Sequence, residues 1–152
     1  MDKLAWCCKQ KRGFVLIKPN EAVGKEYFKE AESDLKDLSN ISLKWKNIVG
    51  YYACYNALYA VLQKIGIKCE IHDCSLNVME IIQEYEQESK ALIKRLKENR
   101  IEVQYYLREP RPIDEKEIAK FIIESKHIFN MITYDEIKEI RAVIEACQAK
   151  KH

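Results

Sequence analysis

The chain has 152 residues, of which 33% are charged and 47% hydrophobic, a mixture typical of one folded domain and not of a disordered chain. Its 26 basic and 24 acidic residues nearly cancel, which excludes a strongly basic surface over the whole molecule. No apolar run reaches the length of a membrane span and no signal-peptide pattern follows Met1, so we expect a cytoplasmic protein without a membrane segment.

Residues 1–19 are predicted to form a basic N-terminal arm ahead of a helical bundle over residues 20–150. The arm contains a single acidic residue, and its apolar side chains include Trp6 and Phe14, which are suited to docking on a neighbouring element. Five positive charges contribute only a modest, salt-sensitive attraction to phosphate, so we expect a docked arm. The basic residues are Lys3, Lys9, Lys11, Arg12 and Lys18.

Two helices are predicted to follow the arm. The first runs over residues 21–39, because apolar residues recur at three- and four-residue steps after Asn20, which is a suitable N-cap. The second runs over residues 44–65 and ends at Gly66, since glycine adopts the left-handed conformation at little cost.

The third predicted helix is the longest. Residues 67–74 are expected to form a turn, and Asp73 or Ser75 to cap a helix that continues to about residue 107. Pro110 and a second proline two residues later stop it, because proline cannot donate a backbone hydrogen bond.

A short fourth helix is predicted to start after Asp114, and a capping box at residues 133–136 is predicted to start the fifth. The chain contains only four glycines and three prolines, a scarcity that favours a few long helices over many turns. No strand pattern is found, so the expected fold is all-α with about five helices.

The predicted second helix carries four tyrosines within nine positions. At roughly 100° per residue, Tyr51 and Tyr55 share one face, while Tyr52 and Tyr59 lie at its edge beside Asn56. Because each phenol hydroxyl needs a partner or water, we expect this helix at an interface or groove rather than deep in the core. Two interpretations stay open: packing between helices or across a dimer, or a groove in which Tyr52, Asn56 and Tyr59 contact a nucleotide.

The six cysteines are expected to be reduced thiols, because the chain is long and helical and lacks a secretory signal. A zinc site built from Cys69, His72 and Cys74 is an alternative, but it needs a fourth ligand from the N-terminal cysteines and lacks the usual spacing. We therefore expect neither a metal nor another cofactor. His72 is instead expected to pin the turn through backbone hydrogen bonds or to lie beside an arginine in the groove.

Three motifs in order resemble the HEPN family (higher eukaryotes and prokaryotes nucleotide-binding domain), in particular its small prokaryotic members encoded beside a minimal nucleotidyltransferase. Those proteins carry a helix reading approximately A-Y-Y-A-M-Y-x-A-x-x-A-x-L, a K-G-I turn with a histidine after it, and a segment reading R-x-x-x-x-Y. Here Gly50–Leu62 reads GYYACYNALYAVL, Lys64–Ile67 reads KIGI with His72 after it, and Arg100–Tyr105 reads RIEVQY. The spacing between these landmarks agrees as well, so the resemblance covers roughly residues 20–150.

The resemblance implies an up-and-down antiparallel helical bundle that forms a homodimer. Active members of the family are metal-independent RNases or toxins that use an arginine and a histidine in the pattern R-x4–6-H. None of the three histidines, His72, His127 and His152, follows an arginine at that spacing, and Tyr105 stands where Arg100 would require a histidine. A tyrosine, whose ordinary pKa is about 10 rather than about 6.5, cannot replace histidine in proton transfer near neutral pH.

The preferred functional hypothesis is a non-catalytic homodimer that binds a minimal nucleotidyltransferase or a nucleotide, as in a toxin–antitoxin-type system. In it Arg100 offers its guanidinium to phosphate, whereas the plainer interpretation is a solvated arginine near a helix end. A second hypothesis is a divergent RNase in which Arg100 binds the scissile phosphate of RNA and His72 acts as the base. A third is a structural helical dimer without a small ligand. The expected ligand-binding residues are Tyr52, Tyr55, Asn56, Tyr59, His72, Arg100 and Tyr105.

Overall fold

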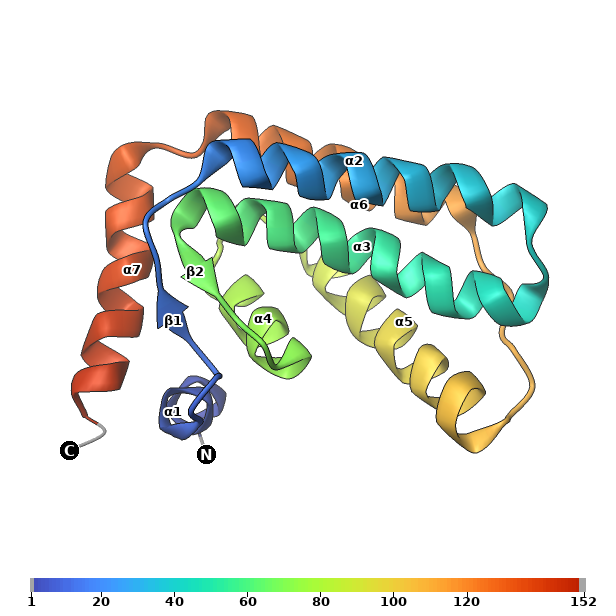
Figure 1. The fold of residues 1–152 in the computed structure, drawn as a ribbon, viewed down its shortest axis with the longest axis horizontal. Coiled ribbons are helices and arrows are strands. Elements are labelled where there is room, and N and C mark those ends of the chain that lie inside the picture. The colour runs from blue at the N-terminus through green and yellow to red at the C-terminus, as the bar shows by residue number, and fades with distance from the viewer. Residues whose placement is uncertain (1, 151–152) are drawn as a thin grey trace.

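The computed structural model describes residues 2–150; Met1, Lys151 and His152 lie outside this part. Within it the chain is helical, as predicted, but it forms seven α-helices instead of five (Figure 1). In chain order the elements are α1 (Lys3–Lys9), β1 (Val15–Leu16), α2 (Glu21–Asp37), the 3-10 helix η1 (Leu38–Asn40), α3 (Leu43–Ile65), β2 (Ile67–Lys68), α4 (His72–Met79), α5 (Gln87–Tyr106), α6 (Glu115–Met131) and α7 (Tyr134–Ala149).

Helix α3 lies at the centre of the molecule, with α2 and α6 along it on one side and α5 crossing it obliquely on the other (Figure 1). Tyr51 and Leu58 are completely buried, and Tyr55 and Tyr59 nearly so. The prediction that this tyrosine-rich helix lies at an interface or groove is therefore wrong. From Gly50 to Leu62 the helix carries apolar or small residues on nearly all sides, and a helix of that kind is buried.

The approach of α2 to α3 is close because both helices present small residues where they meet. A Cβ added to Gly24 of α2 would lie 2.9 Å from the backbone oxygen of Ala60 on α3. Ala60 itself is fully buried. A side chain at position 24 would therefore push the two helices apart.

Four of the predicted helix ends are confirmed, and each rests on a local interaction. Asp114 caps α6 by accepting from the backbone N–H of Lys116 (2.9 Å), although this helix has 17 residues and is not the short one predicted. The Asn20 side chain accepts a hydrogen bond from the backbone N–H of Val23 (3.1 Å), as an N-cap should. Gly66 ends α3 in the left-handed conformation, with φ at +90°. The Thr133 hydroxyl accepts from the N–H of Glu136 (3.1 Å) in the predicted capping box.

The predicted long third helix is wrong, because residues 80–86 interrupt it and separate α4 from α5. In this interruption Tyr85 is buried, hydrogen-bonds the Ser125 hydroxyl of α6 (2.7 Å) and stacks on Phe121. Such tertiary contacts override the helical propensity of the segment. The predicted caps are wrong as well: α4 starts after Ile71 without a side-chain cap, and Ser75 lies buried inside it.

The basic arm is docked on the bundle. Strand β1 pairs antiparallel with β2, with Val15 opposite Lys68, a two-residue ladder where no strand was predicted. Arg141 of α7 secures this junction by donating from Nη1 to the backbone oxygens of Ile17 (2.8 Å) and Gly66 (2.8 Å). The arm thereby joins the end of α3 to α7.

A disulfide joins Cys7 of α1 to Cys74 of α4 across 67 residues of sequence, with Cα atoms 5.7 Å apart. The expectation of six reduced thiols is therefore wrong for this pair. The two cysteines belong to short helices that become neighbours only when the arm packs against the bundle. Among residues 2–150 no helix is long and apolar enough to cross a membrane.

Candidate functional site

Three tyrosines of α3, spaced four residues apart, direct their hydroxyls at residues 69–75, which lead from β2 into the first turn of α4. Tyr51 Oη lies 2.8 Å from His72 Nδ1, and Tyr55 Oη lies 2.9 Å from the Ser75 hydroxyl. Tyr59 Oη accepts a hydrogen bond from the backbone N–H of Cys69 (3.2 Å). These partners explain how phenol groups tolerate burial in the core. Burial also raises the pKa of Tyr51 and Tyr55 well above the ordinary value, so both remain protonated.

The expected ligand-binding residues separate into two groups. Tyr59 stacks on Tyr55 and meets Tyr27 of α2 edge-on, and Asn56 donates to Asp34 of α2 (3.1 Å). These contacts are those of packing between α2 and α3, one of the two interpretations of the tyrosine helix. Tyr55 lies between the groups, because it also stacks on His72 and bonds Ser75. The other expected residues, Tyr52, His72 and Tyr105, lie near Arg100 of α5.

Arg100 is a buried cation, only 8% exposed. Its Nη1 donates to Tyr52 Oη (3.2 Å) and to Gln104 Oε1 (3.2 Å). Its guanidinium carbon lies 4.9 Å from the ring centre of Tyr51 and 5.9 Å from that of Tyr105, distances typical of cation–π contact. It is therefore not the solvated arginine of the plainer interpretation.

The buried guanidinium lacks the partners that usually compensate its charge. No carboxylate in residues 2–150 forms an ion pair with Arg100, and its Nε is a buried donor without a hydrogen-bond partner. Burying a charge in this way is costly unless an anion pairs with it. Arg100 Nε is thus a buried donor for which the described residues supply no acceptor.

His72 is the first residue of α4 and is half-buried. Its ring lies parallel to that of Tyr55, with ring centres 4.0 Å apart. Burial, and to a smaller extent the charges of Arg100 and Lys97, hold the pKa of His72 below its ordinary value. His72 is therefore neutral at pH 7 and offers one donor and one acceptor.

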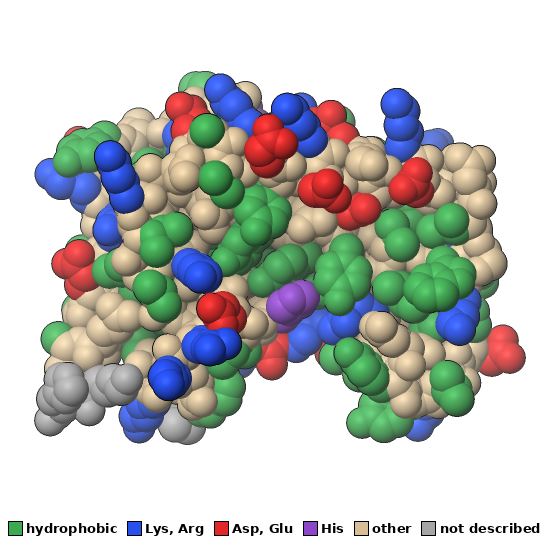
Figure 2. All heavy atoms as spheres, in the orientation of Figure 1, with side chains coloured by type: hydrophobic (Ala, Val, Ile, Leu, Met, Phe, Trp, Pro, Cys, Tyr) green, Lys and Arg blue, Asp and Glu red, His purple; other side chains and the backbone are tan. Residues whose placement is uncertain are grey.

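Tyr51 brings His72 and Arg100 together, because its hydroxyl contacts the histidine and its ring face carries the guanidinium. We call Tyr51, Tyr52, His72 and Arg100 the Arg100 cluster. Figure 2 shows hydrophobic side chains gathered over α3 in the middle of this face, beside a histidine and basic side chains, with the lower edge notched between α4 and α5.

A second cation lies beside the cluster. Lys97 of α5 forms an ion pair with Asp73 of α4. Burial and the neighbouring Arg100 lower the pKa of Lys97 below its ordinary value. Because Asp73 pairs with Lys97, Arg100 is, within residues 2–150, the one of these two cations without a carboxylate partner.

Some residues of this arrangement were missed by sequence reasoning. Gln104 lies one helical turn after Arg100, a spacing that signals a contact on a helix. Nothing in the sequence, in contrast, indicates that the Tyr51 hydroxyl contacts His72, 21 residues away.

The alternative of a zinc site at Cys69, His72 and Cys74 is wrong. Cys74 is bound to Cys7 in the disulfide and cannot serve as a thiolate ligand. Burial raises the pKa of the Cys69 thiol to about 12, which disfavours the deprotonated form that binds metals.

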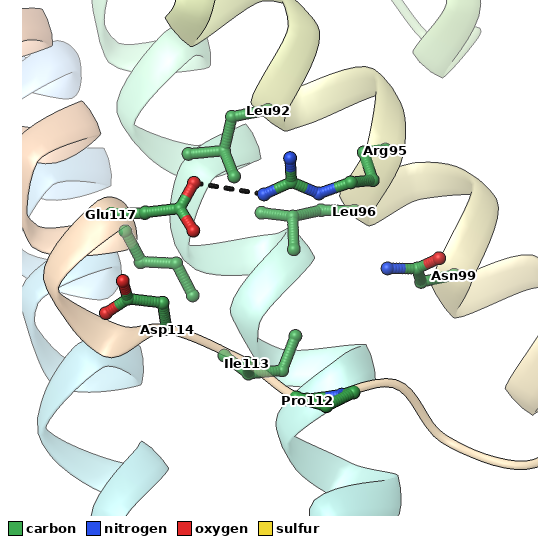
Figure 3. A pocket seen from close by; sticks show the side chains of 9 residues that line it. Leu92, Arg95, Leu96, Asn99, Pro112, Ile113, Asp114 and Glu117 are labelled. Atoms are coloured by element: carbon green, nitrogen blue, oxygen red, sulfur yellow. Dashed lines mark hydrogen bonds and ion pairs between the residues drawn. The ribbon is translucent and has the colours of Figure 1, made fainter.

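A separate cavity of about 280 Å³ lies between α5 and the start of α6 (Figure 3). Arg95 reaches across it to Glu117 in an ion pair of 3.0 Å, and Leu92 and Leu96 form its apolar wall. Both charged side chains are about half exposed, so their pairing contributes little to stability. Arg95 is therefore a suitable reference for Arg100: it lies on the same helix, but it is exposed and paired.

The lowered pKa of His72 predicts a loss of stability in acid. The unfolded chain regains the ordinary histidine pKa of about 6.5 and therefore binds a proton that the folded protein resists. The stabilising contribution is present above pH 6.5 and is lost as the pH falls through the lower pKa of the folded state. Urea unfolding at pH 7.5 and pH 5.5 measures it: the decrease should be smaller in His72→Gln. Equal decreases in the two proteins would contradict this prediction.

Comparison of the chain with models of known protein families, with curated proteins and with solved structures gives no match.

Proposed function

We propose that this protein is a non-catalytic, HEPN-like binding module that holds the phosphate of a nucleotide at the Arg100 cluster. The observation that carries the proposal is the buried Arg100, whose Nε lacks an acceptor. A phosphate is a suitable occupant, because its oxygens accept hydrogen bonds at the fixed spacing of a guanidinium fork. The family resemblance of the tyrosine helix and of the segment from Arg100 to Tyr105 supports the same ligand class.

The surroundings of Arg100 suit the other parts of a nucleotide. Lys97 lies beside Arg100 and offers a second cation to phosphates that displace its partner Asp73. Tyr105 is 64% exposed and lies beside the guanidinium, so its ring is free to stack on a base. Recognition then combines charge at the buried end of the ligand with stacking at the exposed end.

Catalysis is not part of this proposal, because the cluster holds only one group able to transfer a proton near neutral pH. General acid–base assistance is typically worth about 10²–10⁴-fold, and it needs a base with a free acceptor beside the scissile phosphate. His72 already engages Nδ1 with Tyr51. The divergent RNase remains the second candidate, favoured by the contact of both His72 and Arg100 with Tyr51.

The proposed module also associates with a second protein surface, either its own copy in a homodimer or a minimal nucleotidyltransferase. Supporting this, apolar side chains are exposed at the end of α5, where Tyr106 is 67% and Leu107 82% exposed. Exposed apolar surface of this kind often marks an interface. Light scattering at micromolar concentration is expected to report a dimer, and a monomer would favour the hetero-partner.

Calorimetric titration with ATP and with a short RNA tests the nucleotide proposal. We expect ATP to bind, and Arg100→Met to weaken its binding at least about tenfold, because charge-assisted hydrogen bonds are lost. The control Arg95→Met removes an exposed arginine from the same helix and should retain wild-type affinity. Cleavage of the RNA that disappears in both Arg100→Met and His72→Ala would overturn the proposal in favour of the RNase.

A further inference from the structure

We infer that Tyr51 is a positioning residue: its hydroxyl holds His72 in the tautomer that carries the proton on Nε2, so that His72 donates a hydrogen bond to the bound anion. This inference rests on the proposed function and deepens it. A histidine that donates in this way fits a ligand whose oxygens only accept hydrogen bonds, as those of an ionised phosphate do.

The first step of the argument concerns the phenol proton of Tyr51. Tyr51 is completely buried, and His72 Nδ1, 2.8 Å away, is the only hydrogen-bond partner of its hydroxyl among residues 2–150. A buried hydroxyl directs its proton at an available acceptor. The phenol therefore donates and Nδ1 accepts, which places the single proton of the neutral imidazole on Nε2.

Arg100 strengthens this direction of the hydrogen bond. Its guanidinium lies over the Tyr51 ring, with Cζ 4.9 Å from the ring centre. A cation in that position favours withdrawal of electron density from the phenol oxygen and makes the hydroxyl a better donor. The opposite arrangement, with Nδ1 as donor, would leave the phenol proton without an acceptor in the core.

The imidazole ring is fixed as well as its proton. It stacks on Tyr55 with an angle of 10° between the ring planes, and Tyr52 meets it edge-on at 6.1 Å. No residue in the range 2–150 hydrogen-bonds Nε2. The ring thus holds one donor, Nε2–H, which the fold itself does not use. Burial and the neighbouring Arg100 lower the pKa of His72, so the neutral ring is the form present at pH 7.

Long-range ¹H–¹⁵N NMR at pH 7 tests the assignment, with the His72 signals identified by their absence in His72→Gln. We expect wild type to show an unprotonated Nδ1 and a protonated Nε2. In Tyr51→Phe, which retains the ring, we expect a mixture of both tautomers. The matched control Tyr55→Phe removes a hydroxyl that bonds Ser75 instead, and it should keep the wild-type pattern. A protonated Nδ1 in wild type, or an unchanged pattern in Tyr51→Phe, would overturn the inference.

Titration of the same samples with ATP separates this inference from the proposed function. ATP should shift the Nε2–H signal in wild type and bind about threefold more weakly to Tyr51→Phe, as loss of an oriented hydrogen bond implies. ATP binding that leaves the Nε2–H signal unmoved would contradict a donor role for His72. A third outcome is that ATP does not bind, while wild type shows the Nε2–H tautomer and Tyr51→Phe loses it. This outcome would contradict the proposed function but support the role of Tyr51 in fixing the tautomer.

Discussion

Reduction of the Cys7–Cys74 disulfide is expected to lower the free energy of unfolding by about 4 kcal/mol. The bond closes a loop with a sequence separation of 67 residues. In the chain-entropy model, a disulfide stabilises the folded state by about 3 kcal/mol for a loop of 15 residues and by about 4.7 kcal/mol for one of 100, and this loop lies between them. It also ties α1 to α4, two helices of only seven and eight residues. Urea unfolding with and without a thiol reductant measures the difference.

Two variants control the disulfide experiment. The double variant Cys7→Ala with Cys74→Ala should match the reduced protein within about 1 kcal/mol, because each buried alanine still fits an apolar site. Cys147→Ala alters a half-buried cysteine outside the disulfide and should leave the effect of the reductant unchanged. Thiol titration establishes the redox state in each sample. Equal unfolding midpoints for oxidised and reduced protein would contradict the prediction.

Replacement of Arg100 by methionine is expected to stabilise the unliganded protein by about 1 kcal/mol while it abolishes tight nucleotide binding. A buried charge without a counter-ion is costly, and apolar residues that replace buried charged groups are often neutral or stabilising by about 1–4 kcal/mol. Methionine fills irregular space well, and it removes the unpaired donor. Such an exchange of stability for function is expected where a binding site is built into a core.

Arg141→Met is the matched control for this gain of stability. The guanidinium of Arg141 is also hydrogen-bonded within the protein. Unlike that of Arg100, its Nη1 donates to backbone oxygens at the junction of the arm with α3. Its removal leaves those oxygens without a donor and should destabilise the protein by about 1–3 kcal/mol. Urea unfolding of both variants makes the comparison. An Arg100→Met variant as unstable as Arg141→Met would show that Arg100 is a structural tie, and would remove the main support for the nucleotide proposal.

Several helix ends were predictable because their causes are local. The side-chain cap of Asn20, the left-handed Gly66 and the capping box at Thr133 each involve residues within four positions of one another. Interactions at that range are the same in any fold that contains the helix, so the pattern alone determines them. The all-α class followed from the same kind of signal.

Contacts between distant segments decided everything else about the candidate site. The sequence by itself marked His72 and Arg100 as candidates, but only the packing of α4 and α5 against α3 places both on Tyr51. Hydrophobic periodicity indicates that a face is buried without indicating what covers it. For that reason it missed the interruption that Tyr85 anchors and gave no sign that Cys7 meets Cys74. Burial of Arg100 without a counter-ion, the observation on which the proposed function rests, is a property of the packed core alone.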